Sequence, residues 1–233
     1  MRNKTLFGLV VTVLIYLISV LIPRIVKIPI DFFPSSFLTH SMMLLLSGFL
    51  MSYFHSKKLL SFRIKGIKWR LFFKIILTSV LAFIVVNVVS NAIFMVFNIS
   101  IHENKNPFLN FTPAQYFIFV LIYASIAEEF LFRGFLLNML EPIKNRRIKI
   151  HKLTISVSVI LSGFLFGLAH LILLTTDAGI PFVFRIVFLT TTIGIIAGYF
   201  QEKNENNTLP AILVHMTVNA LGLIGLFLTL VMK

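Results

Sequence analysis

Three charged residues lie inside an otherwise apolar stretch, "ASIAEEFLFRGFLL", at residues 124–137. Glu129 and Arg133 are four residues apart, so on a helix they share one face and form an ion pair in the favourable order. Glu128 lies about 100° further round the helix and has no such cation. We therefore expect Arg133 to neutralise and hold Glu129, and Glu128 to carry chemistry. The competing interpretation is an ion-pair network that only fixes helix packing.

Two further pairs of residues lie in later apolar segments, each pair four residues apart: "FGLAH" holds Phe166 and His170, and "HMTVN" holds His215 and Asn219. One glutamate, two histidines and an amide suit hydrolysis of a peptide bond by water. In this scheme Glu128 accepts a proton from water that His170 positions. His215 and Asn219 donate hydrogen bonds to the developing oxyanion, each worth about 2.7–4 kcal/mol.

A zinc-dependent version of this chemistry is also open, because Glu128, His170 and His215 all have side chains that bind zinc. Cysteine is absent, which excludes disulfides and thiolate catalysis. The only aspartates, Asp31 and Asp177, fall in expected loops, which excludes an aspartyl dyad. We expect the other histidines to be interfacial: His40, His55, His102 and His151.

The segments that carry these residues are long and apolar. Of the 233 residues, 58% are hydrophobic and 12% charged, with a mean hydropathy of +0.96. A soluble domain could not bury so much apolar surface, so we predict an all-α, polytopic transmembrane helix bundle that forms a single domain, 1–233. Seven spans of about 20 residues are expected, at 6–22, 37–54, 72–99, 114–140, 153–174, 181–200 and 209–232.

The net charge of +13 comes from basic residues gathered between the spans. Residues 55–71 and 141–152 are rich in lysine and arginine, whereas residues 100–113 contain one lysine. The positive-inside rule then makes both basic loops and the N-terminus cytoplasmic, and the C-terminus external after an odd number of spans. These charges indicate membrane lipids as partners and exclude nucleic acid, because no nucleic-acid module accompanies them.

The fourth span is marginal by itself. Its three charges cost about 7–10 kcal/mol on insertion scales, and its leucine, isoleucine, phenylalanine and valine residues return about 4–8 kcal/mol. The span must therefore face a polar cavity or partner helices. The expected depths of these residues in the membrane disagree. Glu128 and His170 lie about 18–26 Å along their helices from the cytoplasmic ends of their spans, whereas His215 lies about 9 Å from its own. The three residues can therefore meet only if the last helix begins deep in the membrane.

The ordered set "EEFLFR", "FGLAH" and "HMTVN" resembles the Glu-Glu-x-x-x-Arg, Phe-x-x-x-His and His-x-x-x-Asn/Asp motifs of one family. This is the CAAX prenyl endopeptidase and bacteriocin-processing family, also called CPBP or Abi. The resemblance covers residues 115–225, the expected catalytic core, and leaves out the first three spans. It implies an intramembrane endopeptidase with the following site residues: Glu128 and His170 on water, His215 and Asn219 on the oxyanion, and Glu129, Arg133 and Phe166 as orienting groups.

The resemblance also limits the cofactor and the substrate. Members are called metalloproteases although a bound metal is disputed, so zinc is a candidate cofactor with Glu128, His170 and His215 as candidate ligands. Eukaryotic members cut a C-terminal tripeptide from prenylated proteins, and bacterial relatives are linked to peptide processing, signal-peptide maturation and bacteriocin self-immunity. The implied substrate is a peptide or protein, lipidated or with a leader or signal peptide, at a bacterial plasma membrane.

Two other functions stay open at this point. A proton-coupled transporter could use Glu128 and the histidines as a relay, although the chain lacks the internal repeat that such folds often carry. A non-catalytic immunity or scaffold protein could bind a partner in the bilayer with the same polar residues.

Overall fold

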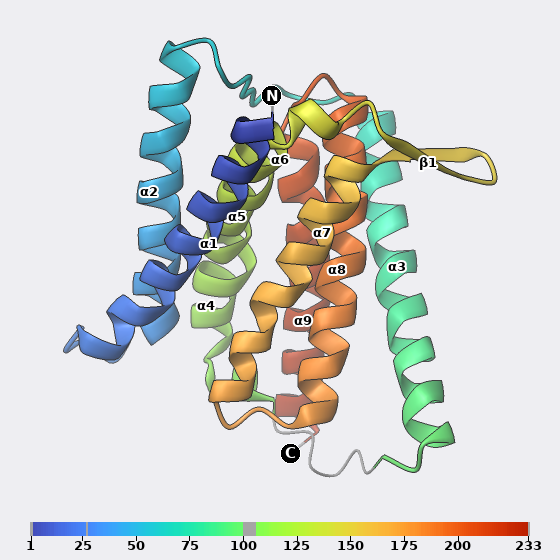
Figure 1. Ribbon diagram of the computed structural model, residues 1–233. Coiled ribbons are helices and arrows are strands. Elements are labelled where there is room, and N and C mark those ends of the chain that lie inside the picture. The colour runs from blue at the N-terminus through green and yellow to red at the C-terminus, as the bar shows by residue number, and fades with distance from the viewer. Residues whose placement is uncertain (1, 27, 100–105, 233) are drawn as a thin grey trace.

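The computed structural model describes residues 2–26, 28–99 and 106–232 and shows a bundle of long helices (Figure 1). Within these ranges, six helices are long and apolar enough to cross a membrane. Five of the long helices are α1 (Arg2–Ile25), α2 (Ser35–Ser56), α3 (Trp69–Val96), α8 (Ile180–Lys203) and α9 (Leu209–Val231); the other is α7 (Val157–Ala169) continued by the 3₁₀-helical η5 (His170–Thr175). The predicted all-α polytopic bundle is confirmed, and the chain is an integral membrane protein.

The expected span at 114–140 is also helical, but its hydrogen-bond pattern changes along its length. It runs through α4 (Pro113–Gln115), the π-helical η2 (Tyr116–Ala124), α5 (Ser125–Glu129), the π-helical η3 (Phe130–Leu136) and α6 (Leu137–Met139). Thr112 begins it with a capping box, in which Thr112 and Gln115 each accept the other's backbone N–H. Such π-helical turns often occur at functional sites. Here they flank the short segment that carries Glu128 and Glu129.

The span expected from Leu153 begins four residues later. The short helical turn η1 (Pro107–Asn110) precedes α4, and another, η4 (Glu141–Ile143), follows α6. The chain then forms an antiparallel hairpin of β1 (Arg147–Ile150) and β2 (Leu153–Ser156). His151 takes a φ of 51° in its turn. The Ser156 side chain then accepts the Val159 N–H at 3.2 Å and caps α7. The predicted boundary was wrong because these residues pair as strands.

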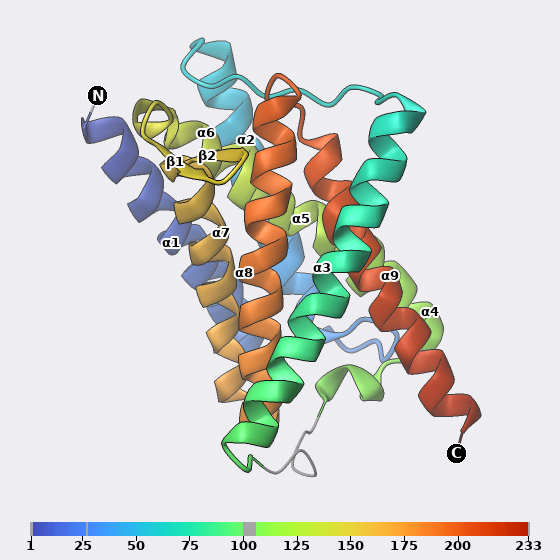
Figure 2. The same cartoon turned by 90° about the vertical axis from the view of Figure 1, so that its right-hand side faces the viewer.

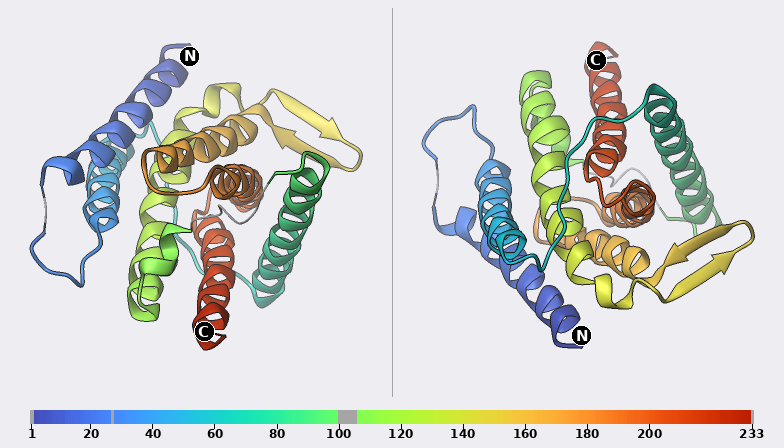
Figure 3. Two further views of the ribbon diagram at one scale, coloured as in Figure 1. Left: turned by 90° about the horizontal axis from the view of Figure 1, so that it is seen from below. Right: turned by 90° about the horizontal axis from the view of Figure 1, so that it is seen from above.

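The continuous helix from α4 to α6, the central helix, lies between the α1–α2 pair on one side and α9 on the other, as the end-on views of Figure 3 show. The helix α3 packs against α8 and α9 on the side of the bundle that faces the viewer in Figure 2. The N-terminus, both basic loops and residues 204–208 lie at one end of the bundle, and the C-terminus lies at the other. This arrangement agrees with the predicted topology, while the side of the membrane that each end faces stays a prediction.

Two glycines of α7 allow α8 to approach closely. A Cβ atom added at Gly163 would lie 2.7 Å from the backbone nitrogen of Ile195, and one added at Gly167 would collide with Thr191. Side chains at these positions would push the helices apart, and α7 carries the chain directly to His170.

We expect Gly163→Ala to destabilise the protein by about 1–3 kcal/mol, because the methyl group meets backbone that has no room to move. Gly48→Ala is the matched control, since a Cβ atom there meets nothing within 4 Å among the described residues. Because alanine has a higher helix propensity than glycine, Gly48→Ala should leave the stability unchanged or raise it by up to about 1 kcal/mol. Denaturant unfolding in detergent micelles measures both, and equal stability of the two variants would contradict this packing.

Candidate active site

Three histidine side chains surround the carboxylate of Glu128. Its Oε1 lies 3.2 Å from Nε2 of His40, and its Oε2 lies 3.8 Å from Nε2 of His215 and 4.0 Å from Nε2 of His170. The four residues come from α5, α2, α9 and the junction of α7 with η5. The structure thus brings Glu128, His170 and His215 together, as the sequence predicts.

The expected conflict in depth does not arise. His215 is close to Glu128 although it lies only two turns into α9, so α9 must begin deeper in the bundle than the neighbouring helices end. The tilt of α9 across the bundle is visible in Figure 2. The late start of α7 at Val157 also shortens the distance from its first residue to His170.

The hydrogen-bond partners of His170 and His215 fix where their protons lie. Nδ1 of His170 is 2.9 Å from the carbonyl oxygen of Phe166, and Nδ1 of His215 is 3.1 Å from Oε1 of Glu129. Both partners are acceptors, so each Nδ1 must donate. In the neutral form each ring therefore presents an unprotonated Nε2 to Glu128. At 3.8–4.0 Å neither nitrogen bonds the carboxylate directly, and these separations are those of two acceptors that share one donor molecule.

His40 differs from the other two histidines, because its Nε2 is within hydrogen-bond distance of Glu128 and donates to it. Its side chain is 12% exposed, and its Nδ1 is buried without a partner among the described residues. The prediction that His40 is interfacial was therefore wrong. Tyr123 of the central helix holds α2 in place, since its ring stacks on Phe37 and its hydroxyl lies 2.9 Å from that of Ser41.

No pattern in the sequence marked His40, because the residues one turn away on α2 include no charged or amide side chain, only the hydroxyl of Ser36. The prediction for two of the other histidines agrees with the structure. His55 lies at the end of α2, 3.2 Å from the Leu60 carbonyl oxygen, and His151 is exposed in the hairpin turn. His102 lies outside the described residues.

Glu129 and Arg133 form the expected ion pair. Arg133 Nε lies 3.2 Å from Glu129 Oε2, and both side chains are fully buried. The pair is not an aligned hydrogen bond, and the guanidinium nitrogens of Arg133 make no hydrogen bond in the described part of the chain. The other Glu129 oxygen accepts from His215, so this carboxylate orients that imidazole.

Phe166 is the side chain against which three of these polar groups pack. The Arg133 guanidinium lies 4.4 Å from the centre of the Phe166 ring, which is a cation–π distance. The same ring meets the rings of His170 and His215 edge to face, at 5.0 Å and 5.4 Å between centroids. Phe166 is fully buried, so it fixes the spacing of the two histidines.

Asn219 is placed differently from the expectation. Its side-chain amide donates to the carbonyl oxygen of Val120 and to the hydroxyl of Ser125, both at 3.0 Å. These bonds use both N–H groups of the amide and tie α9 to the central helix. To donate to a substrate, Asn219 would have to release one of them.

The spacing of the polar groups does not match a zinc site. Within residues 2–26, 28–99 and 106–232, no group of three or more histidine, cysteine, aspartate or glutamate side chains has the geometry to hold a metal ion. His170 and His215 lie 4.0 Å and 3.8 Å from Glu128 Oε2, whereas bonds of about 2.0–2.1 Å put tetrahedral ligands about 3.3 Å apart.

Residues 110–221 match the family model described as "Type II CAAX prenyl endopeptidase Rce1-like". This is the family that the three motifs predicted, and the match includes all seven residues that the sequence singled out. It does not include α1, α2 and α3, and so leaves out His40. Comparison with curated proteins and with solved structures gives no match.

We expect Arg133→Met to destabilise the protein by about 3–5 kcal/mol, because it leaves the buried Glu129 carboxylate without its cation. The double variant Glu129→Gln/Arg133→Met should recover part of this loss, since no unpaired charge remains. Arg63→Ala is the control, because Arg63 and Glu205 form an exposed pair at 3.1 Å that is worth at most about 1 kcal/mol. Equal unfolding free energies for Arg133→Met and Arg63→Ala would show that the buried pair does not stabilise the bundle.

Proposed function

From the match of residues 110–221 to the Rce1-like CAAX prenyl endopeptidase family, we propose that the chain hydrolyses peptide bonds with a water molecule activated by Glu128 and His170. The family match supports a CAAX-type intramembrane endopeptidase in general. The single observation that carries the mechanism is the 4.0 Å separation of Glu128 Oε2 from His170 Nε2. Both atoms are acceptors when the carboxylate is ionised and the imidazole is neutral.

A water molecule can occupy the position between these two acceptors, about 2.8 Å from each, and donate one hydrogen to each. Its lone pairs then face away from both groups and toward a substrate carbonyl carbon. As the new C–O bond forms, the water proton passes to Glu128 and the carbonyl oxygen becomes an oxyanion. Glu128 then delivers that proton to the amide nitrogen as the C–N bond breaks, which releases an amine and a carboxylic acid.

We assign oxyanion stabilisation mainly to His215, and to Asn219 only in second place. A protonated His215 would donate from Nε2 and still keep its Nδ1 bond to Glu129. Its Nε2 lies 3.8 Å from Glu128, on the side of the carboxylate where water would bind. Asn219 joins only after it releases Val120 or Ser125, so its resting role is to hold α9.

His40 acts as a positioning residue for Glu128. Its Nε2–H bond occupies Oε1 and leaves Oε2 to face His170 and His215. Without it, the carboxylate could rotate about its terminal torsion, which is broad for glutamate. We propose that one carboxylate oxygen is held while the other performs the proton transfer.

The substrate class follows from the family and from the place of the site. Glu128 lies inside the bundle of an integral membrane protein, so a substrate must be able to reach this depth. A lipidated protein terminus, or a leader or signal peptide anchored in the bilayer, meets this requirement.

We expect Glu128→Gln and His170→Ala each to lower cleavage by about 10²–10⁴-fold, since each removes one of the two groups that bind the water. Peptides released from membranes that carry the parent but not Glu128→Gln identify the substrate, and the purified proteins are then assayed with it. Full activity of either folded variant would defeat the mechanism. Elemental analysis of the parent tests the zinc alternative, because stoichiometric zinc would make Glu128, His170 and His215 metal ligands instead.

His40→Leu should lower kcat by about 10²-fold with little change in KM, because a misplaced carboxylate slows proton transfer and leaves substrate binding intact. His40→Gln should restore part of kcat, since its amide can still donate to Oε1. His55→Leu is the matched control, because it removes a histidine of the same helix that lies away from Glu128. A kcat for His40→Leu equal to that of His55→Leu would remove His40 from the mechanism.

A further inference from the structure

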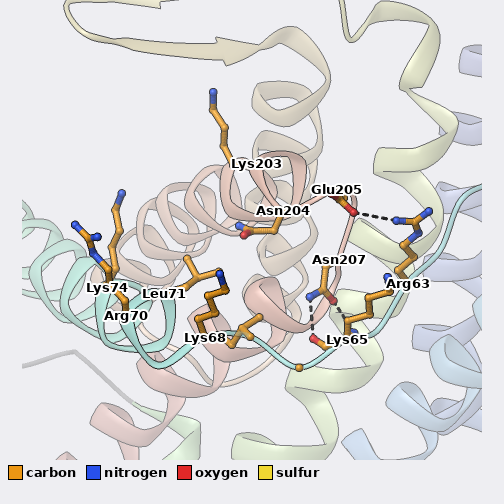
Figure 4. A pocket seen from close by; sticks show the side chains of 12 residues that line it. Arg63, Lys65, Lys68, Arg70, Leu71, Lys74, Lys203, Asn204, Glu205 and Asn207 are labelled. Carbon is orange, nitrogen blue, oxygen red and sulfur yellow. Dashed lines mark hydrogen bonds and ion pairs between the residues drawn. The ribbon is translucent and has the colours of Figure 1, made fainter.

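A basic hollow of about 640 Å³ opens at the end of the bundle that holds the N-terminus and both basic loops (Figure 4). It lies between the start of α3 and the loop that joins α8 to α9, and it shares no residue with the site around Glu128. Its charged lining is six cations and one anion: Arg63, Lys65, Lys68, Arg70, Lys74, Lys203 and Glu205.

Most of this positive charge has no acidic partner. Arg63 pairs with Glu205 at 3.1 Å, and within the part of the chain that the structure describes no ion pair neutralises the other five cations. Figure 4 shows Arg70 and Lys74 together at one side of the hollow and Lys203 at another. Like charges gathered in one hollow repel each other, so an anion bound among them would be favoured.

The wall that carries Arg63 and Lys65 is held in place by hydrogen bonds. The N–H of Thr208 donates to the Arg63 carbonyl oxygen at 2.9 Å. Asn207 accepts the Lys65 N–H at 3.0 Å and donates to the Lys65 carbonyl oxygen at 2.8 Å. Asn207 is 6% exposed, so these bonds are shielded from water. This wall of the hollow is therefore formed by a fixed backbone.

The start of α3 is unfavourable without an anion. Lys68 occupies the N-cap position with no side-chain hydrogen bond to the helix, and the first turn contains no acidic residue. Lysine is not a preferred N-cap residue, and Arg70 adds a second cation at the positive end of the helix dipole. An anion in the adjacent hollow would relieve both effects.

Aromatic side chains place the hollow at the membrane surface. Trp69 is 72% exposed at the first residue of α3, and its ring stacks on that of Phe73 at 5.6 Å. Exposed tryptophan at the end of a spanning helix lies at the level of the lipid headgroups. The hollow beside it is thus at the height of lipid phosphates, next to the face of α3 that meets the acyl chains.

We propose that this hollow binds the phosphate group of an anionic phospholipid from the adjacent leaflet. Lys68 and Arg70 at the start of α3 contact the phosphate oxygens, Lys203 adds positive charge from the end of α8, and Trp69 packs against the lipid beside them. Inorganic phosphate offers the same charge without the acyl chains, so it is the source from which a lipid must be distinguished.

The test is native mass spectrometry of the detergent-purified protein titrated with phosphatidylglycerol, phosphatidylcholine or inorganic phosphate. The parent should retain phosphatidylglycerol in preference to phosphatidylcholine. Lys68→Ala/Lys203→Ala should lose at least about tenfold in affinity for phosphatidylglycerol, because each cation near a lipid surface contributes about fivefold. Lys149→Ala/Lys152→Ala is the matched control, since it removes two cations from the exposed hairpin at the same end.

Equal retention of phosphatidylglycerol by Lys68→Ala/Lys203→Ala (the hollow variant) and Lys149→Ala/Lys152→Ala (the hairpin variant) would overturn the proposal. Equal retention of phosphatidylglycerol and phosphatidylcholine by the parent would also overturn it. Inorganic phosphate that binds the lipid-free protein, and is lost in the hollow variant while phosphatidylglycerol is not, would overturn the lipid assignment. Lys74→Glu, on an exposed turn of α3, is the second variant if the double variant does not fold. It should lower phosphatidylglycerol affinity in the same direction.

Discussion

Two adjacent carboxylates, Glu128 and Glu129, lie inside an apolar bundle, and the rest of the site depends on how each is neutralised. Burying a charge is costly unless it is paired. Glu129 is shared between Arg133 of its own helix and His215 of α9. Glu128 has no cation one turn away and is met instead by histidines from three other helical segments. The first carboxylate is fixed by two partners, and the second is the one to which the proposed mechanism assigns proton transfer.

The remaining elements bring these partners to the right depth. The π-helical stretches η2 and η3 flank α5, so the helix that carries both glutamates departs from regular α geometry on either side of them. The two α7 glycines allow α8 to pack closely in the two turns before His170, and Phe166 spaces His170 from His215. The helix α2, outside the family match, supplies the hydrogen bond that orients Glu128.

The sequence predicts much of this arrangement, because insertion into lipid and helix periodicity act locally. The long apolar helices follow from hydropathy, and the Glu129–Arg133 pair follows from spacing along one helix. The meeting of Glu128 with His170 and His215 follows from the resemblance of the three motifs to one family, against the depth estimate. His40 does not, since its role depends on how α2 packs against the central helix. The hairpin before α7 was missed because its residues pair as strands. The depth of α9 was missed because a residue count along straight helices does not contain the tilt or the starting level of each helix. The bonds of Asn219 to Val120 and Ser125 likewise depend on tertiary contact.

The arrangement of imidazoles around Glu128 is tested most directly by ¹⁵N NMR of the histidine side chains in the purified protein. The structure predicts that His170 and His215 carry the proton on Nδ1 in their neutral forms, and that His40 carries it on Nε2. It also predicts that Glu128→Gln shifts the Nε2 resonances of all three residues. A proton on Nε2 of neutral His170, with resonances that do not respond to Glu128→Gln, would contradict the account.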